Sequence, residues 1–250
     1  MKQFLNKLLG KKSSSDSVQS TEQHVDVRER YPIQNDRTPD LSVACEDRRP
    51  ASSQNAADII ANGSCGNTTK WTFYKNGELV ISGNGSMNDY LPNTYEDGKK
   101  VAPWYSHCAN IRSIKIEKGV SHIGKWAFAY CRNLVNVTFD GRLDELPWGS
   151  FAFAEKLERI TIPNGVSRIA ADVFMDCHLL RSVVIPNGVQ EIGESAFYNC
   201  YALAEINLPN TLTDIDSYAF AFCGQLTRLR IPRSVSYIHE KAFYKSGVRR

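Results

Sequence analysis

The apolar residues of this chain recur at a fixed interval of 23 positions from residue 111 onward. Phenylalanine fills one column of this pattern, at Phe128, Phe151, Phe174, Phe197, Phe220 and Phe243. A second column is aliphatic and holds Ile123, Leu146, Ile169, Ile192, Ile215 and Ile238. Repeats of this length, each too small to bury its own apolar side chains, are typical of solenoid proteins in which every coil packs on the next. The sequence therefore predicts a solenoid of six 23-residue coils over residues 111–250.

Each repeat begins with the pattern of a strand and ends with the spacing of a helical turn. In residues 180–202 the start, LRSVVI, alternates apolar and polar positions, and Pro186 ends the strand because it lacks an N–H group for the ladder. Further on, Ala196, Phe197 and Cys200 stand three and four positions apart, the spacing of one helical face. We expect an α/β solenoid with a parallel β-sheet on its concave side and short helical turns outside.

The repeats resemble a known family. The segments LERITIPNGVSRIAADVFMDC and LRSVVIPNGVQEIGESAFYNC are similar to the BspA-type leucine-rich repeat, and the likeness extends over residues 111–248. The upstream segment WTFYKNGELVISGNGSMNDY resembles the sequence that often precedes such repeats. The resemblance implies a right-handed, curved solenoid that is used for binding, often on microbial cell surfaces, and it implies no catalysis.

Residues 65–110 are expected to cap the first coil. The segments WTFY and ELVIS flank an Asn-Gly pair, which is a strong signal for a β-hairpin turn. A hairpin here would cover the open sheet edge and the apolar face of the first coil. Tyr105 and Cys108 lie one period before Phe128 and Cys131, so this part should also supply the outer half of a coil.

Residues 1–64 are predicted to form a disordered arm, because they are polar, poor in aromatic residues and without a sustained period. Residues 58–61 are expected to form a transient turn or to lead into the folded part. Residues 1–12 have leucines and lysines on opposite helical faces, so the alternatives are an amphipathic membrane contact, an export signal and a frayed polar terminus. We favour the frayed terminus, because Lys7 and Lys11 interrupt the apolar stretch.

The net charge of +3 is mild, which argues against a dedicated nucleic-acid-binding protein. No stretch is long and apolar enough to cross a membrane. Because the export signal is not convincing, a cytoplasmic location is favoured. The alternative, a cell-surface or secreted protein, comes from the family resemblance alone.

The cysteines follow the packing pattern. Five of the seven share one column, at Cys108, Cys131, Cys177, Cys200 and Cys223, with Ala154 and Ser246 at the other positions. We expect buried, reduced thiols, since a free cysteine behaves as a small apolar side chain. Cys45 and Cys65 lie outside the column and would pair only in an exported protein. Neither CxxC nor HExxH occurs, so we expect no metal, no cofactor and no catalytic centre.

The candidate binding surface is the concave strip, because the residues between the inward-pointing positions of each strand face solvent there. This strip carries six bases against two acids and includes Lys115, Arg159, Arg181, Arg228 and Arg230. Such a strip would steer an acidic protein or glycan toward it. The alternative is that these side chains only keep an edge-rich sheet soluble.

Two further features concern partners. Trp148 lies in the least regular repeat and is either an exposed aromatic anchor or part of a degenerate repeat. The coil that ends near Arg250 keeps apolar inward positions, so it is either covered by a partner such as a second copy or frayed. The sequence thus favours a non-enzymatic module that binds a protein partner through the concave face of the solenoid. The alternative is a surface adhesin for host matrix or glycans.

Overall fold

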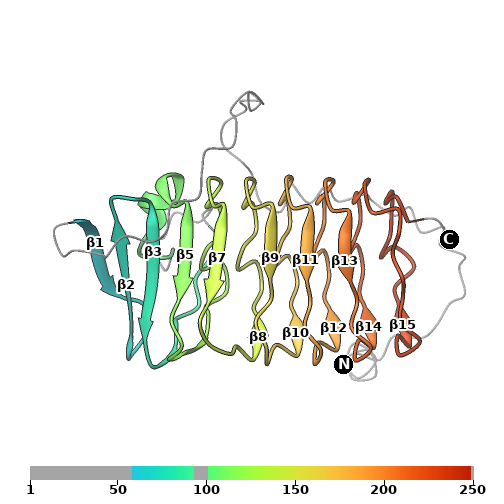
Figure 1. The fold of residues 1–250 in the computed structure, drawn as a ribbon, viewed down its shortest axis with the longest axis horizontal. Coiled ribbons are helices and arrows are strands. Elements are labelled where there is room, and N and C mark those ends of the chain that lie inside the picture. Colours follow the sequence, from blue (N-terminus) through green and yellow to red (C-terminus); the bar gives the residue numbers. More distant parts are fainter. Residues whose placement is uncertain (1–57, 93–100, 249–250) are drawn as a thin grey trace, which may run out of the picture. The chain divides into compact units, whose positions relative to one another are not determined.

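The computed structural model describes residues 58–92 and 101–248, which form a β-solenoid with two parallel sheets (Figure 1). The first sheet runs along one side of the coils through β1 (Ile59–Ser64), β2 (Thr69–Tyr74), β3 (Glu78–Gly83), β5 (Ser113–Ile116) and β7 (Asn136–Phe139), and then resumes with β9 (Arg159–Thr161), β11 (Ser182–Val184) and β13 (Glu205–Asn207). The second sheet consists of β8 (Glu145–Leu146), β10 (Arg168–Ile169), β12 (Glu191–Ile192), β14 (Asp214–Ile215) and β15 (Tyr237–Ile238), while β4 (Gly85–Ser86) pairs separately with β6 (Val120–His122).

The strand register confirms the 23-residue repeat. Ser182 of β11 lies between Arg159 and Glu205, and Glu191 of β12 lies between Arg168 and Asp214, so each step moves by one period. The same step places equivalent apolar side chains above one another in a continuous core.

The phenylalanine column is confirmed as a stack of rings along this core. Successive ring centroids lie 5.2 to 5.8 Å apart from Phe128 to Phe243. In the cap, Trp104 and not Tyr105 continues the stack, with its ring 5.6 Å from that of Phe128. The larger indole also donates from Nε1 to the carbonyl oxygen of Ala127 at 2.8 Å, which gives its buried N–H a partner.

The outer segments of the six coils are tight turns in the described residues, which differs from the helical spacing of their side chains. Their backbones bond between coils: Phe151 donates its N–H to Val173, and Phe153 to Met175. Alternate residues such as Phe153 (φ 62°) adopt the left-handed conformation that aims these groups at the neighbouring coil. Bonds between coils therefore replace the regular i to i−4 bonds of a helix.

The predicted hairpin is confirmed as β2 and β3, which pair antiparallel across a turn at Lys75–Gly77. Gly77 has φ 84°, and a Cβ atom there would lie 2.9 Å from the carbonyl oxygen of Asn110, so glycine suits this turn. β3 also pairs in parallel with β5, so the hairpin continues the first sheet and covers its edge as expected. The 3-10 helix η2 (Tyr105–Asn110) lies in the outer part of the cap.

The lower boundary of the cap differs from the prediction. Residues 59–64 were assigned to the disordered arm, but they form strand β1, which pairs antiparallel with β2. Ile59 and Ala61 alternate with more exposed neighbours, as expected when a short strand covers one side of a sheet. Residues 1–57, with the predicted arm, the amphipathic start and Cys45, lie outside the described residues.

The last coil is less regular than predicted. Residues 227–231 form no strand beside β13, although β15 continues the second sheet. In the described residues this coil packs on one neighbour, and Ile231, Tyr237 and Ile238 are all exposed. Self-association through this coil stays a prediction.

Candidate partner-binding surface

The solvent-exposed side of strands β5, β7, β9, β11 and β13 is the surface that the sequence singled out, and we call it the front face. On each strand an apolar residue such as Ile160 or Val183 points inward, while its neighbours point outward. The short interstrand distance of a parallel sheet, about 4.8 Å, lines these outward side chains up in rows.

The candidate residues of the front face differ in their surroundings. Lys115 on β5 forms an ion pair with Asp140 at 3.4 Å, so one carboxylate already offsets its charge. Arg159 on β9 and Arg181, just before β11, are exposed and have no ion pair among the described residues. These two arginines are therefore available to an external acidic group.

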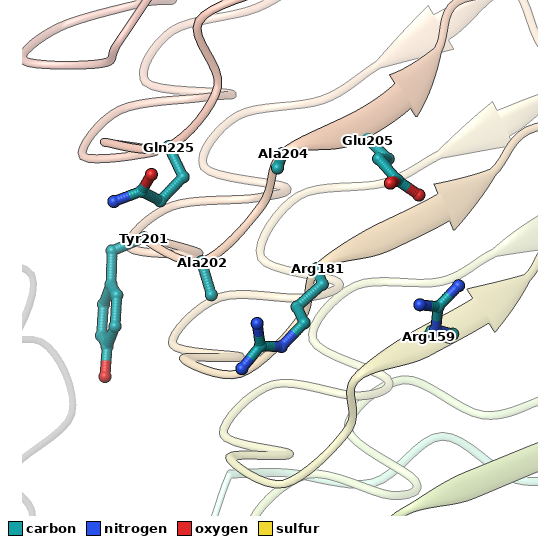
Figure 2. A pocket seen from close by; sticks show the side chains of 7 residues that line it. All are labelled: Arg159, Arg181, Tyr201, Ala202, Ala204, Glu205 and Gln225. Carbon is teal, nitrogen blue, oxygen red and sulfur yellow. The ribbon is translucent and has the colours of Figure 1, made fainter.

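A pocket of about 480 Å³ brings Arg159 and Arg181 together (Figure 2). Its other lining residues are Tyr201, Ala202, Ala204, Glu205 and Gln225. It lies where the outer turns of three successive coils lead into β9, β11 and β13. The pocket thus joins the flat sheet surface to a raised wall made by Tyr201 and Gln225, which Figure 2 shows beside Arg181.

Tyr201 is 48% exposed, yet its ring is held from below. It stacks on the imidazole of His178 with 5.3 Å between ring centroids. His178 Nε2 lies 3.2 Å from Asp176 Oδ1, and Asn199 donates from Nδ2 to the same oxygen at 2.6 Å. This polar cluster fixes the aromatic wall of the pocket.

Sequence reasoning missed Tyr201 and Gln225, because it considered only the positions within each strand. The column that contains Tyr201 also holds Arg132, Glu155 and His178. Arg132 and Glu155 form an ion pair at 2.6 Å, so this corner column contains contacts between successive coils. An aromatic residue in an otherwise polar column was the available signal.

The remaining candidates lie apart from the pocket residues. Arg228 and Arg230 belong to residues 227–231, beyond the last strand of the first sheet. Trp148 follows β8 of the second sheet, so it is not part of the front face. It is 42% exposed and donates from Nε1 to Asp172 Oδ2 at 2.7 Å, and its role as an anchor stays a prediction.

The cysteine column is buried as predicted, and it supplies no reactive group. Cys131 Sγ lies 3.3 Å from Cys108 Sγ, while Cys177 and Cys200 donate to backbone carbonyl oxygens of neighbouring coils. Burial raises the pKa of the Cys177 and Cys200 thiols well above the usual range, so both stay protonated. Cys65 is also buried and free, whereas Cys45 lies outside the described residues.

Two searches over the described residues returned nothing. They contain no group of three or more histidine, cysteine, aspartate or glutamate side chains that could hold a metal ion. They also contain no helix that is long and apolar enough to cross a membrane.

The stacked 23-residue coils, with one sheet of short parallel strands and a column of buried cysteines, define a leucine-rich-repeat solenoid. The sequence matches the BspA type leucine rich repeat region in six copies, over residues 102–181 and 144–249. The chain belongs to this family, whose members are generally interaction or surface proteins and not enzymes. No curated protein matches the chain.

Solved structures agree with the fold. The chain is 25% identical to a leucine-rich repeat protein of T. pallidum, with a TM-score of 0.51, covering 74% of this chain and 86% of that one. It is 24% identical to a leucine-rich repeat protein of Bacteroides ovatus, with a TM-score of 0.49, covering 73% of this chain and 56% of that one. The match therefore spans just over half of the Bacteroides ovatus chain.

Proposed function

We propose that this protein is a non-enzymatic binding module that holds an acidic protein partner on its front face. The observation that carries the proposal is the pocket in which Arg159 and Arg181, both exposed and without an ion pair among the described residues, lie beside Tyr201. Arginine and tyrosine are enriched among the residues that contribute most to protein–protein binding.

The charge of the front face supports an acidic partner. Its unpaired arginines would raise the rate of encounter with a negatively charged surface, and this effect weakens with salt. Arg228 and Arg230 extend the basic character toward the last coil. The buried core beneath holds the strands in fixed rows, so these charges keep their spacing when a partner binds.

The test is charge reversal on the front face. Arg181→Glu combined with Arg228→Glu lowers the net charge by four, from +3 to −1. We expect the immobilised variant to lose most of the acidic proteins that the unchanged protein captures from a lysate of its source, as measured by quantitative mass spectrometry. The thermal unfolding midpoint should not fall, because both side chains are exposed.

The matched control is Lys118→Glu with Arg168→Glu, which makes the same charge change outside the strands of the first sheet. This control should retain capture. Equal losses in both variants would mean that net charge alone governs capture, and undiminished capture by the Arg181 and Arg228 variant would reject the front face as the binding site.

A further inference from the structure

The pocket at the start of β9, β11 and β13 carries a defined balance of charge. Arg159 and Arg181 contribute two positive charges, and Glu205 contributes one negative charge. In the strand register Arg159 and Glu205 lie on either side of Ser182, which puts their backbones about 10 Å apart at two strand spacings. A polyanion would meet Glu205 along with the arginines, whereas a single carboxylate can bind beside the arginines alone.

The rest of the pocket is apolar and aromatic. Ala202 and Ala204 carry only methyl side chains, and Tyr201 raises an exposed ring beside them. The stack of that ring on His178, which Asp176 fixes in turn, holds it in place before any ligand arrives. A prepositioned ring loses little conformational freedom on binding, so it favours an apolar or aromatic group of the ligand.

The pocket is open along the strands, as Figure 2 shows, and its residues come from three successive coils. An extended peptide crossing the coils would span the distance from Tyr201 to the arginines with two adjacent residues, since each extended residue covers about 3.3 Å. From this geometry we infer that the pocket recognises one acidic side chain next to an aromatic side chain in an extended segment of the partner. The inference rests on the proposed function, because it specifies what the front face binds.

The test uses defined probes in place of the unknown partner. Acetyl-Gly-Phe-Glu-Gly-amide is titrated into the full ¹⁵N-labelled chain, and the Nε–Hε signals of Arg159 and Arg181 are followed by NMR. We expect saturable shifts with a dissociation constant of about 1 mM, the range of a small contact. Acetyl-Gly-Phe-Gln-Gly-amide should bind about fivefold more weakly, since it keeps the shape of the side chain but lacks the charge.

Variants locate the site on the protein. Arg181→Gln should weaken binding of the glutamate peptide about fivefold, and Tyr201→Ala about threefold. Arg168→Gln on the second sheet is the matched control and should bind as the unchanged protein does. All three side chains are solvent-exposed, and a thermal melt of each variant checks that it is folded.

The other outcomes each reject the inference. Equal binding of the glutamate and glutamine peptides would remove the carboxylate from it, tighter binding of a sulfated heparin tetrasaccharide would make the pocket a polyanion site, and no shift at about 10 mM peptide would leave the pocket without this function. If the peptide fails while the Arg181 and Arg228 reversal still reduces capture, only this inference fails. If the peptide binds while capture is unaffected, the proposed function fails and the pocket stands.

Discussion

Replacing one ring in the phenylalanine stack gives a quantitative test of the solenoid core. Phe174 is fully buried and stacks on Phe151 at 5.8 Å and on Phe197 at 5.3 Å. Phe243 in the last coil is only partly buried and stacks on Phe220 alone, at 5.5 Å. The same substitution should therefore cost more at position 174 than at position 243.

The magnitudes follow from these contacts. An aromatic pair contributes about 0.5–1.5 kcal/mol beyond the burial of its surface, so Phe174→Leu, which breaks two pairs, should lower the free energy of unfolding by about 1–3 kcal/mol. Phe243→Leu breaks one pair and should cost about half as much. Phe174→Ala also leaves a cavity and should cost about 3–5 kcal/mol.

Urea unfolding followed by far-ultraviolet circular dichroism measures all three variants. The slope of the free energy against urea concentration should stay constant, so that the midpoint reports stability. Equal costs for leucine at positions 174 and 243 would refute the reasoning, because the ring contacts at these positions differ by a factor of two in number.

Three further predictions concern individual buried positions. Ser150→Ala should raise the free energy of unfolding in urea by about 1 kcal/mol, because the Ser150 hydroxyl is buried without a partner in the described residues and Ala127 occupies the equivalent place one coil earlier. Gly149→Ala should lower it by about 1–3 kcal/mol, since a Cβ atom there would lie 2.5 Å from the Trp126 ring, and adding Trp126→Ala should lessen the loss in a double-mutant cycle. Cys200 should react with iodoacetamide at pH 8 only after unfolding, because burial keeps its thiol protonated; mass spectrometry of the native protein that found rapid alkylation would contradict this.

The repeat pattern predicts the core well because burial and period coincide in a solenoid. A residue such as Phe197 or Ile192 occupies an equivalent position in its coil, and every such position faces the same interior. The column, once read from the sequence, therefore fixes both the coil register and the inward face of each strand.

The conformation of the outer segments could not be predicted in the same way. The spacing of Ala196, Phe197 and Cys200 fits a helical face, but the N–H of Phe197 bonds to the carbonyl oxygen of Ala219 in the next coil. Ten non-glycine residues among those described have φ between 51° and 63°, including Ser195 and Asn199 in this segment. Side-chain spacing describes a single coil, whereas these bonds depend on the packing of two, so the pattern within one repeat could not distinguish a helix from stacked turns.

Strand β1 and the position of Trp104 were missed for a related reason. Both lie in the cap, where the 23-residue period does not extend, so no column indicated their places. Counting back one period pointed to Tyr105, and the bulkier neighbour took the site because its indole both stacks on Phe128 and donates to Ala127. Outside the repeats, side-chain volume and hydrogen bonding decide the packing.

The pocket lies where the sequence departs from its own repeat, and this separates scaffold from specificity. Positions that repeat from coil to coil, such as Phe174 and Phe197, face the core and are interchangeable in their packing. The corner column changes from an ion pair at Arg132 and Glu155 to a ring stack at His178 and Tyr201, and the strand row changes sign between Arg159 and Glu205. A uniform solenoid would offer a partner the same surface at every step, so only such departures can fix where along the stack a partner binds. The coils that line the pocket are the ones in which these two departures meet.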